Sequence, residues 1–473
     1  MRAVVADHEE AVQGMLADLL IGSHLMSFER MPSLVAENAA RAGFSDVRIY
    51  LGDLQRNVLR LLTGKGLDAA QDAPEGIAEL TVEGTVAGRA YQYGRMMATG
   101  DVRPGAHGWW VPLLDGAERL GVLHVTSPRD DAQTRRDMYA LASLVALLVI
   151  STRDVSDSYA RFSRVRPMNV AAEMQWTLMP PRTYADGRVV IGAAMEPAYE
   201  VSGDAYDYAV ADNVVHLSMF DAMGHDTAAG ITANLALGAC RNNRRQNTPL
   251  SALGDAVEQV LLEQFGTSRY VTGILADLDT STGMLTWVNR GHHPPIVIRG
   301  GRWTSLLRCP PAHPMGTDLH LPTTVCHEQL QPGDRLVLYT DGITEARTAE
   351  GREFGVHRFI DFLVRHHADQ LSVPETLRRL IRALLKHHDD RLHDDASLLV
   401  CEWLGPDTHL SRAAPLAGIP LPTTTADGYG RGPGGEGSGG SRGGLPKLAT
   451  RPVHTSKRVS LRSRAVARSI SRA

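Results

Sequence analysis

The sequence predicts a layered α+β fold for the C-terminal half of the chain. Between residues 186 and 403, apolar segments such as NVVHLSMF (213–220), RLVLYT (335–340) and ASLLVCEW (396–403) read as strands. Two long helical stretches, 227–264 and 356–388, interrupt them. Strands grouped on either side of helices favour stacked layers, since a parallel doubly wound sheet would place a helix between successive strands.

The first 150 residues alternate helical and strand patterns, which predicts a separate α/β domain. ADHEEAVQGMLADLLIGSHL (6–25) reads as a helix and VRIYLGD (47–53) as a strand. In GTVAGRAYQYGR (84–95), small residues suit the tight start of a helix. WWVPLLDGAERLGVLHVTS (109–127) reads as two strands joined by a turn at Asp115-Gly116, and a helix then runs through Ile150.

These N-terminal motifs resemble a GAF sensory domain. Gly84, Gly88 and Ala90 lie in the glycine-punctuated helix of that family, while 111–113 (VPL) and 121–123 (GVL) match its paired strands. The resemblance covers the first third of the chain and implies a sensory domain with a small-molecule or protein ligand that the sequence does not identify. No cysteine lies in this region, so attachment of a tetrapyrrole through a thiol is not expected.

Residues 151–185 form a predicted helical connector. The segment VAAEMQWTLMPPR (170–182) places Val170, Met174 and Leu178 at i, i+4 and i+8, and it stops at a Pro-Pro pair. This stripe suits a helix that packs on its own domain. It suits equally a helix that passes a signal between domains or forms a homodimer, and the sequence leaves these interpretations open.

The chain from 405 to 473 is predicted to be a disordered tail. It contains GRGPGGEGSGGSRGGLP (430–446), a composition that cannot build a core. From Gly430 to Ala473 there are ten Lys or Arg and one Glu, so this part carries +9 and the rest of the chain −13. An acidic body argues against nucleic-acid binding by bulk charge. Contact of the basic tail with an acidic surface or a membrane is the alternative to a solvated tail.

The cysteines and apolar runs predict a cytoplasmic protein. Cys240, Cys309, Cys326 and Cys401 lie far apart, without a CxxC motif, which favours a reducing compartment and buried, unreactive thiols. MRAVVADHEE becomes acidic too early for a signal peptide. The longest apolar run, ALASLVALLVI (140–150), is too short for a transmembrane segment.

Aspartates at predicted strand ends are the candidate site. Asp221 ends the strand 213–220, Asp341 follows RLVLYT, Asp204 lies in EVSGDAYD (200–207), and the pair 394–395 precedes the last strand. Converging carboxylates repel one another unless a cation neutralises them, and oxygen ligands favour Mg²⁺ or Mn²⁺. Two such ions can activate water for attack on a phosphoryl group. Taken alone, Asp221 is equally well interpreted as a turn residue that caps the following helix.

The order and flanks of these motifs resemble the SpoIIE-like branch of the metal-dependent protein phosphatases (PPM), which includes RsbU-type regulators. The motifs are SGDAYD, FDAMGHD, YVTGILADLD, NRGHHPPIVI, GDRLVLYTDGITEAR and DDASLLV, within residues 186–404. The resemblance implies an αββα sandwich with two Mn²⁺ or Mg²⁺ ions at one rim. It also implies hydrolysis of phosphoserine or phosphothreonine in a protein, such as an anti-sigma-factor antagonist in bacterial stress or developmental signalling.

The family's metal ligands are carried over residue by residue. Asp221 matches the aspartate that bridges both metals, and the Ala222 carbonyl would be a further ligand. Asp341 and Asp394 match ligands of one metal. Asp204 matches an acid that touches the metal cluster directly or through water.

Neighbouring positions match less closely. Asp395 is the less favoured acid of its pair, because Asp394 aligns with the first position of the family's D-[DN]-x-[ST] motif. Gly224 and His225 fall in the family's GHG turn. The N-A-G-H element, structural or substrate-side, is matched by Asn289, Gly291 and His292.

Three positions depart from the family pattern. Ser202 replaces a glycine of GGD, Asp226 replaces the last glycine of GHG, and Arg290 replaces the alanine of NAGH. These departures bring loop conformation and substrate preference into question. A non-catalytic sensor or docking protein that keeps the fold only to bind a partner is the alternative function, although an intact acidic set argues against it.

Overall fold

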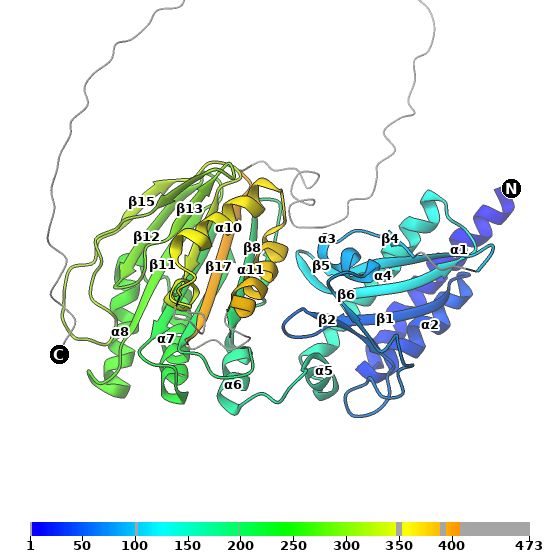
Figure 1. The fold of residues 1–473 in the computed structure, drawn as a ribbon, viewed down its shortest axis with the longest axis horizontal. Coiled ribbons are helices and arrows are strands. Elements are labelled where there is room, and N and C mark those ends of the chain that lie inside the picture. The colour runs from blue at the N-terminus through cyan, green and yellow to red at the C-terminus, as the bar shows by residue number, and fades with distance from the viewer. Residues whose placement is uncertain (1, 100–102, 197, 347–351, 388–393, 407–473) are drawn as a thin grey trace, which may run out of the picture. The chain divides into compact units, whose positions relative to one another are not determined.

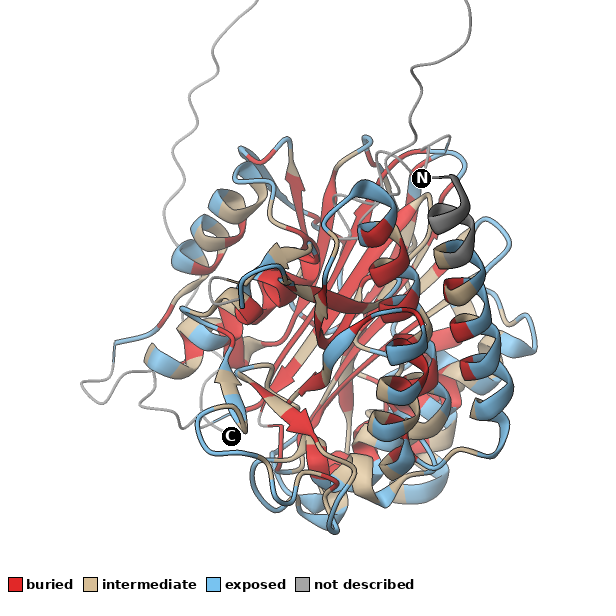
Figure 2. Cartoon of the chain, turned by 90° about the vertical axis from the view of Figure 1, so that its right-hand side faces the viewer, coloured by how far each residue is buried: buried red, intermediate tan, exposed pale blue. Residues whose placement is uncertain are grey.

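The computed structural model describes residues 2–99, 103–196, 198–346, 352–387 and 394–406, which belong to one compact unit (Figure 1). The basic tail therefore lies outside the described residues. Buried residues concentrate in the strands, while the helices carry exposed residues along their outer faces (Figure 2). Among the described residues, no single helix is long and apolar enough to cross a membrane, although the bent pair 132–153 and 157–163 together passes that test.

The N-terminal domain is a six-stranded antiparallel sheet in the order β3-β2-β1-β6-β5-β4. Its core packs helices 31–41 and 132–153 against the sheet, and helix 2–22 packs on these two helices. The bounds are α1 (Arg2–Gly22), η1 (Ser23–Leu25), η2 (Phe28–Arg30), α2 (Met31–Arg41), β1 (Ser45–Gly52), β2 (Val58–Leu62), β3 (Glu79–Thr81), α3 (Val86–Tyr93), β4 (Met97–Ala98), β5 (His107–Asp115), β6 (Glu118–Ser127) and α4 (Ala132–Arg153).

The motifs that suggested a GAF domain have physical roles in this sheet. The Thr85 hydroxyl accepts a hydrogen bond from the Gly88 amide and caps α3. A Cβ at Gly88 would collide with the Val82 backbone, so α3 needs a glycine at the point where it packs against the backbone of Val82. The predicted turn at Asp115-Gly116 joins β5 to β6. The GAF assignment and the domain boundaries at 150, 185 and 404 stay predictions.

The connector contains α5 (Asp157–Ser163) and α6 (Val170–Leu178). Its apolar stripe is exposed, since Val170, Met174 and Leu178 have exposed fractions of 80%, 54% and 38%. The helix α6 does pack on α7 of its own domain, but not through this stripe. Instead, α6 buries Ala172 and Gln175 on its opposite side.

The C-terminal domain is a sandwich of two antiparallel sheets, which confirms the predicted layered α+β class. The sheet orders are β15-β12-β11-β10-β9 and β14-β13-β16-β17-β8-β7. The pair α7 and α8 packs on the first sheet, and α11 packs on the second (Figure 1). The bounds are β7 (Thr183–Ala185), β8 (Val189–Glu196), β9 (Asp204–Ala211), β10 (Val214–Ala222), α7 (Thr227–Arg245), α8 (Leu250–Phe265), β11 (Val271–Asp279), β12 (Met284–Arg290), β13 (Ile296–Arg299), β14 (Trp303–Leu306), β15 (Cys326–Gln329), β16 (Arg335–Tyr339), α9 (Asp341–Thr344), α10 (Val356–Ala368), α11 (Val373–His387) and β17 (Ala396–Trp403).

Each predicted long helix is in fact a pair of helices. Asn247 adopts φ 59° between α7 and α8, and Pro249 follows it directly before α8. Gln370 adopts φ 56° between α10 and α11. A left-handed residue ends a helix, and a proline favours the start of the next one.

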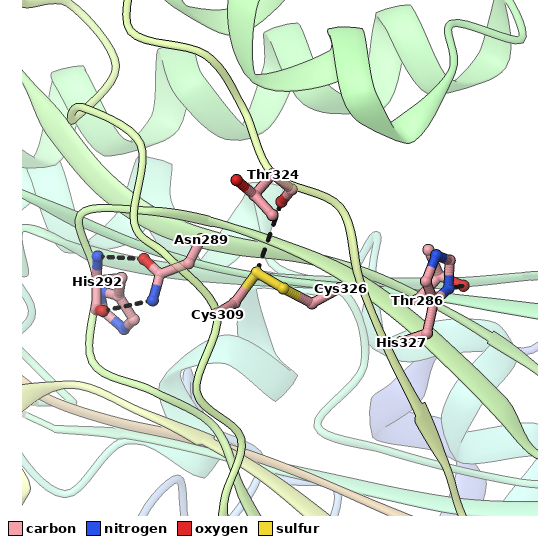
Figure 3. Close-up of a disulfide and its surroundings, with 7 residues drawn as sticks. All are labelled: Thr286, Asn289, His292, Cys309, Thr324, Cys326 and His327. Carbon is pink, nitrogen blue, oxygen red and sulfur yellow. Dashed lines mark hydrogen bonds between the residues drawn. A yellow bond between two sulfur atoms is a disulfide. The ribbon is translucent and has the colours of Figure 1, made fainter.

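Two of the four cysteines contradict the expectation of unreactive thiols. Cys309 and Cys326 form a disulfide (Figure 3). Cys240 and Cys401 are free and buried, as expected, and burial raises the pKa of Cys240 to about 12. Sequence spacing alone did not reveal this pair. The two cysteines are 17 residues apart, and the chain between β14 and β15 folds back so that Cys326 lies next to Cys309.

Candidate active site

The first sheet places Asp204 and Asp221 side by side. β9 and β10 pair antiparallel so that Asp204 is the direct partner of Asp221. Asp204 begins its strand and is 2% exposed, while Asp221 lies one residue before the end of β10. The strand pairing therefore brings together, at one end of the sheet, two aspartates that belong to separate sequence motifs.

The second sheet adds Asp341 and Asp395 at the same rim. Asp341 starts α9 directly after β16, and Asp395 precedes β17, which pairs with β16. A Cβ at Gly342 would collide with the Asp395 carbonyl, so the two segments touch through backbone. Thr340 ties the sheets together, because its hydroxyl donates to the Asp204 carboxylate at 2.7 Å and accepts from the Ser397 amide at 2.9 Å.

The two acids of the 394–395 pair have different environments. The Asp395 carboxylate is buried and accepts a hydrogen bond from the Gly203 amide. Asp394 is exposed, and its carboxylate accepts from the Asp395 amide at 2.9 Å. Asp395 is thus already engaged in holding the loop before Asp204. This arrangement agrees with Asp394 as the favoured ligand, which stays a prediction.

The rim is electrostatically strained without a counter-charge. Burial and the neighbouring Asp341 and Asp394 raise the pKa of Asp221 to about 7. Burial raises the pKa of Asp395 to about 6, although the Gly203 amide opposes this effect. Burial and the charge of Asp221 raise the pKa of Asp204 well above its usual range. Each shift has the same physical cause, which is that carboxylates crowd together in a poorly solvated place.

The donor set fits a hard divalent cation. Within the described residues, none of these aspartates forms a salt bridge with Lys or Arg, and the nearest cationic partner is His293, 3.9 Å from Asp341. As they stand, the described side chains form no ready-made cluster of three ligands. Crowded oxygen donors whose only basic partner among the described residues is histidine nevertheless match Mg²⁺ or Mn²⁺, which would relieve the repulsion.

Two departures from the family pattern have local explanations. Ser202 is buried, and its hydroxyl accepts from the Asp204 amide at 3.0 Å, so it fixes the start of β9. Asp226 is the N-cap of α7, because its carboxylate accepts from the Ala229 amide at 2.8 Å. Arg269 lies 3.8 Å from Asp226 and offsets part of its charge. The helix-capping role considered for Asp221 thus belongs to Asp226.

The third departure, Arg290, points away from the rim. Its guanidinium is fully buried and donates to Asp255 at 2.6 Å and to Glu258 at 2.7 Å, both on α8. His313 also contacts Glu258, with its Nε2 at 2.7 Å. Arg290 therefore fastens β12 to α8 and has no direct part in the acidic rim.

The histidine of the NRGH motif is structural. Asn289 forms two hydrogen bonds with the His292 backbone, at 2.8 and 2.9 Å (Figure 3). The His292 ring is buried between Thr272 and the Tyr339 carbonyl, and burial lowers its pKa to about 4. Of the two interpretations left open for this motif, the geometry of His292 supports the structural one.

Sequence reasoning missed two residues at this site. His293 is half-exposed, stacks on Tyr339 with ring centroids 6.0 Å apart, and faces Asp341. Gln175 on α6 is fully buried and makes three hydrogen bonds to the loop before β9: to the Ser202 carbonyl and amide, and to the Asp204 carbonyl at 2.6 Å. In the sequence, the signals for these residues were the second histidine of the His292-His293 pair and a single glutamine on the side of α6 opposite its apolar stripe.

The chain is similar to several known proteins. Residues 211–404 match the family model of Stage II sporulation protein E (SpoIIE). The chain is 24% identical over 233 residues to phosphoserine phosphatase RsbU of Bacillus subtilis, which covers 49% of this chain and 69% of that protein. It is 23% identical over 239 residues to protein IcfG of Synechocystis, which covers 44% of this chain and 37% of that protein. The SiaA-PP2C domain of Pseudomonas aeruginosa matches with a TM-score of 0.43 and 19% identity, over 53% of this chain and 98% of that domain.

Proposed function

We propose that this chain, whose residues 211–404 match the SpoIIE family model, is a PPM-type protein-serine/threonine phosphatase that hydrolyses phosphoserine or phosphothreonine with the help of two divalent ions. One observation carries the proposal. Asp204 and Asp221 from one sheet meet Asp341 and Asp395 from the other at a single rim, and among the described residues histidine is their only basic partner. The pKa values of Asp204, Asp221 and Asp395 are raised, whereas the contact with His293 lowers the pKa of Asp341.

Five groups would hold the two Mn²⁺ or Mg²⁺ ions: the carboxylates of Asp204, Asp221, Asp341 and Asp394, and the Ala222 carbonyl. Such ions, when bound, lower the pKa of a water molecule and neutralise the phosphoryl oxygens. The chain would hold the ligands in a fixed orientation, because Thr340 bonds the carboxylate of Asp204 and Gln175 bonds its backbone carbonyl.

Backbone segments approach closely around the rim. A Cβ at Gly203 would collide with the Gly224 carbonyl, so these two segments approach without side chains between them. Gly224 adopts φ 92°, which glycine tolerates best. His293, beside Asp341, is positioned to donate a hydrogen bond to a substrate oxygen.

The proposed substrate is a phosphorylated protein, and more narrowly an anti-sigma-factor antagonist in bacterial signalling. The name of the Bacillus relative, phosphoserine phosphatase, supports the class of reaction. Asp394 is exposed, so phosphoserine on the surface of a partner protein could reach the rim. An enclosed pocket would instead favour a small phosphate ester.

We further propose that the N-terminal domain regulates this site. The Gln55 amide contacts the buried Glu196 carboxylate at 3.2 Å. Glu196 ends β8, and its strand partner is Ala396, the residue after Asp395. Glu83 reaches Arg378 on α11 through a second, charged contact. A movement of the N-terminal domain would thus act on the strand that follows the 394–395 pair.

The test of the catalytic proposal is Asp221→Asn in the full chain, assayed on a phosphoserine peptide across a Mn²⁺ titration. A loss of ~10²-fold in kcat/KM is expected, about 3 kcal/mol in the barrier, because the bridging charge is lost. Asp341→Asn and Asp394→Asn should behave alike, and Asp395→Asn should be milder. The Asp221/Asp341 double variant should be hardly worse than either single one, since the acids act as a unit.

The matched control is Asp277→Asn, an aspartate on β11 that pairs with His216 on the neighbouring strand. It should retain normal turnover. Near-normal turnover by folded Asp221→Asn at saturating Mn²⁺ would contradict the two-metal site. Absence of phosphatase activity in the wild-type chain with every phosphopeptide and with p-nitrophenyl phosphate would favour the non-catalytic docking function instead.

A further inference from the structure

The disulfide closes a segment that lies against the acidic end of the first sheet. We call residues 309–326 the clasped segment. It begins after β14 and ends at Cys326, the first residue of the edge strand β15 (Figure 3). Cys309 is 6% exposed, and Cys326 is partly exposed, so a reagent from solvent meets Cys326 first.

The clasped segment supports the strand next to Asp221. Met315 and Val271 exchange two backbone hydrogen bonds, each 2.9 Å long. Val271 is in turn the strand partner of Ala222, the residue after Asp221. The neighbouring Tyr270 carbonyl accepts from the Met223 amide at 3.2 Å. Two backbone steps therefore separate the clasped segment from the proposed metal ligands.

A second fastening holds the middle of the clasped segment. His313 contacts the Glu258 carboxylate, and the Asp318 amide donates to the same carboxylate at 2.9 Å. Arg290 donates to Glu258 and also to the Thr323 hydroxyl at 3.0 Å. Because these contacts do not involve the cysteines, opening the disulfide would loosen the segment without unfolding it.

The surroundings of the disulfide suit the reduced state as well. The Cys309 sulfur lies 3.5 Å from the Thr324 carbonyl (Figure 3). As a thiol, Cys309 could donate a hydrogen bond to that oxygen. A cysteine pair that forms a disulfide when oxidised and has a hydrogen-bond acceptor for its thiol when reduced is suited to thiol–disulfide exchange. Cys240 and Cys401 are buried and stay unreactive.

We propose that Cys309–Cys326 is a thiol–disulfide exchange site, at which a dithiol reductant releases the clasped segment and weakens its support of the Asp221 end of the sheet. A reductant thiolate attacks the Cys326 sulfur, the S–S bond breaks, and Cys309 leaves as a thiolate that takes up a proton. The second thiolate of the reductant then displaces Cys326. The protein gains two electrons and two protons, and the reductant becomes a disulfide.

The experiment compares the full chain purified without reductant, the same protein after dithiothreitol, and that sample reoxidised with oxidised glutathione once the dithiothreitol has been removed. Free thiols in denatured protein should rise from two to four and return to two. Amide exchange at Val271 and Met315 should accelerate at least tenfold on reduction. The Mn²⁺ concentration for half-maximal phosphatase activity, a readout that rests on the proposed function, should rise severalfold.

Two variants complete the test. Cys309→Ser/Cys326→Ser should behave as the reduced protein and not respond to dithiothreitol, while Cys240→Ser should respond as wild type does. Four free thiols in protein purified without reductant, or unchanged exchange at Met315 after reduction, would overturn the proposal. Thiol counts and amide exchange do not need catalysis, so a failed phosphatase assay leaves this test intact.

Discussion

At the scale of single residues, the acidic rim makes stability and metal binding depend on pH. Asp221 and Asp395 have pKa values raised to about 7 and about 6, because burial and neighbouring carboxylates disfavour their charged forms. In the unfolded chain both would ionise near pH 4. The folded protein therefore binds more protons than the unfolded chain between about pH 4 and pH 7, and in that window the contribution of these groups falls as pH rises.

We accordingly predict that the metal-free protein loses free energy of unfolding as pH rises from about 4.5 to about 7. Added Mn²⁺ should stabilise the protein most at and above pH 7, because the ion replaces the bound protons. Denaturant unfolding with EDTA or Mn²⁺ at several pH values measures both effects. Asp221→Asn should flatten the metal-free pH dependence, and a slope equal to that of wild type would contradict the assignment of Asp221 as its main source.

At the scale of elements, α6 is the helix that holds the loop before β9. It does so through Gln175, which bonds both backbone groups of Ser202 and the Asp204 carbonyl. The exposed stripe of Val170, Met174 and Leu178 lies on the same helix. A partner bound to that stripe would thus act on Asp204 through one residue.

We predict that Gln175→Ala raises the Mn²⁺ concentration needed for activity and lowers kcat/KM roughly tenfold. The variant leaves buried backbone groups unsatisfied, which should cost about 1–3 kcal/mol in the free energy of unfolding. Thr177→Ala is the matched control, since its hydroxyl bonds only the Glu173 carbonyl within the exposed part of α6. Equal metal dependence of Gln175→Ala and wild type would show that α6 does not orient Asp204.

At the scale of the whole molecule, the contacts between the N-terminal domain and α11 would give the proposed regulation a physical route. Glu83 pairs with Arg378 at 2.5 Å and with Arg382 at 2.8 Å. Arg378 is buried, and it also pairs with Glu375. Because the buried Arg378 takes one of its carboxylate partners from the N-terminal domain, a ligand-induced shift of that domain would act on α11.

We predict that Glu83→Ala changes the rate on a phosphoprotein substrate severalfold while the Mn²⁺ dependence stays as in wild type, since every proposed ligand lies after residue 200. Glu79→Ala is the matched control, because Glu79 pairs with Arg60 inside the N-terminal domain. Steady-state dephosphorylation of the physiological substrate measures the effect. Identical rates for both variants and wild type would contradict a regulatory role for this contact.

The sequence by itself determined the local features of this protein. Apolar segments predicted β10, β16 and β17 close to their observed bounds, and the aspartates at the strand ends predicted the candidate site. Such patterns succeed because they record which positions of an element are buried and where the element stops. They also gave the layered class, since the order of strands and helices restricts the ways in which layers can cover one another.

Only the tertiary structure decided how these elements meet. It paired Asp204 with Asp221, turned Arg290 toward α8, exposed the stripe on α6 and joined Cys309 to Cys326. It also buried Ala229, Ala233 and Cys240 on α7 and left Ile231 exposed. The physical reason is common to all of these: a residue's partner depends on the element that packs opposite it, and local periodicity does not record that element.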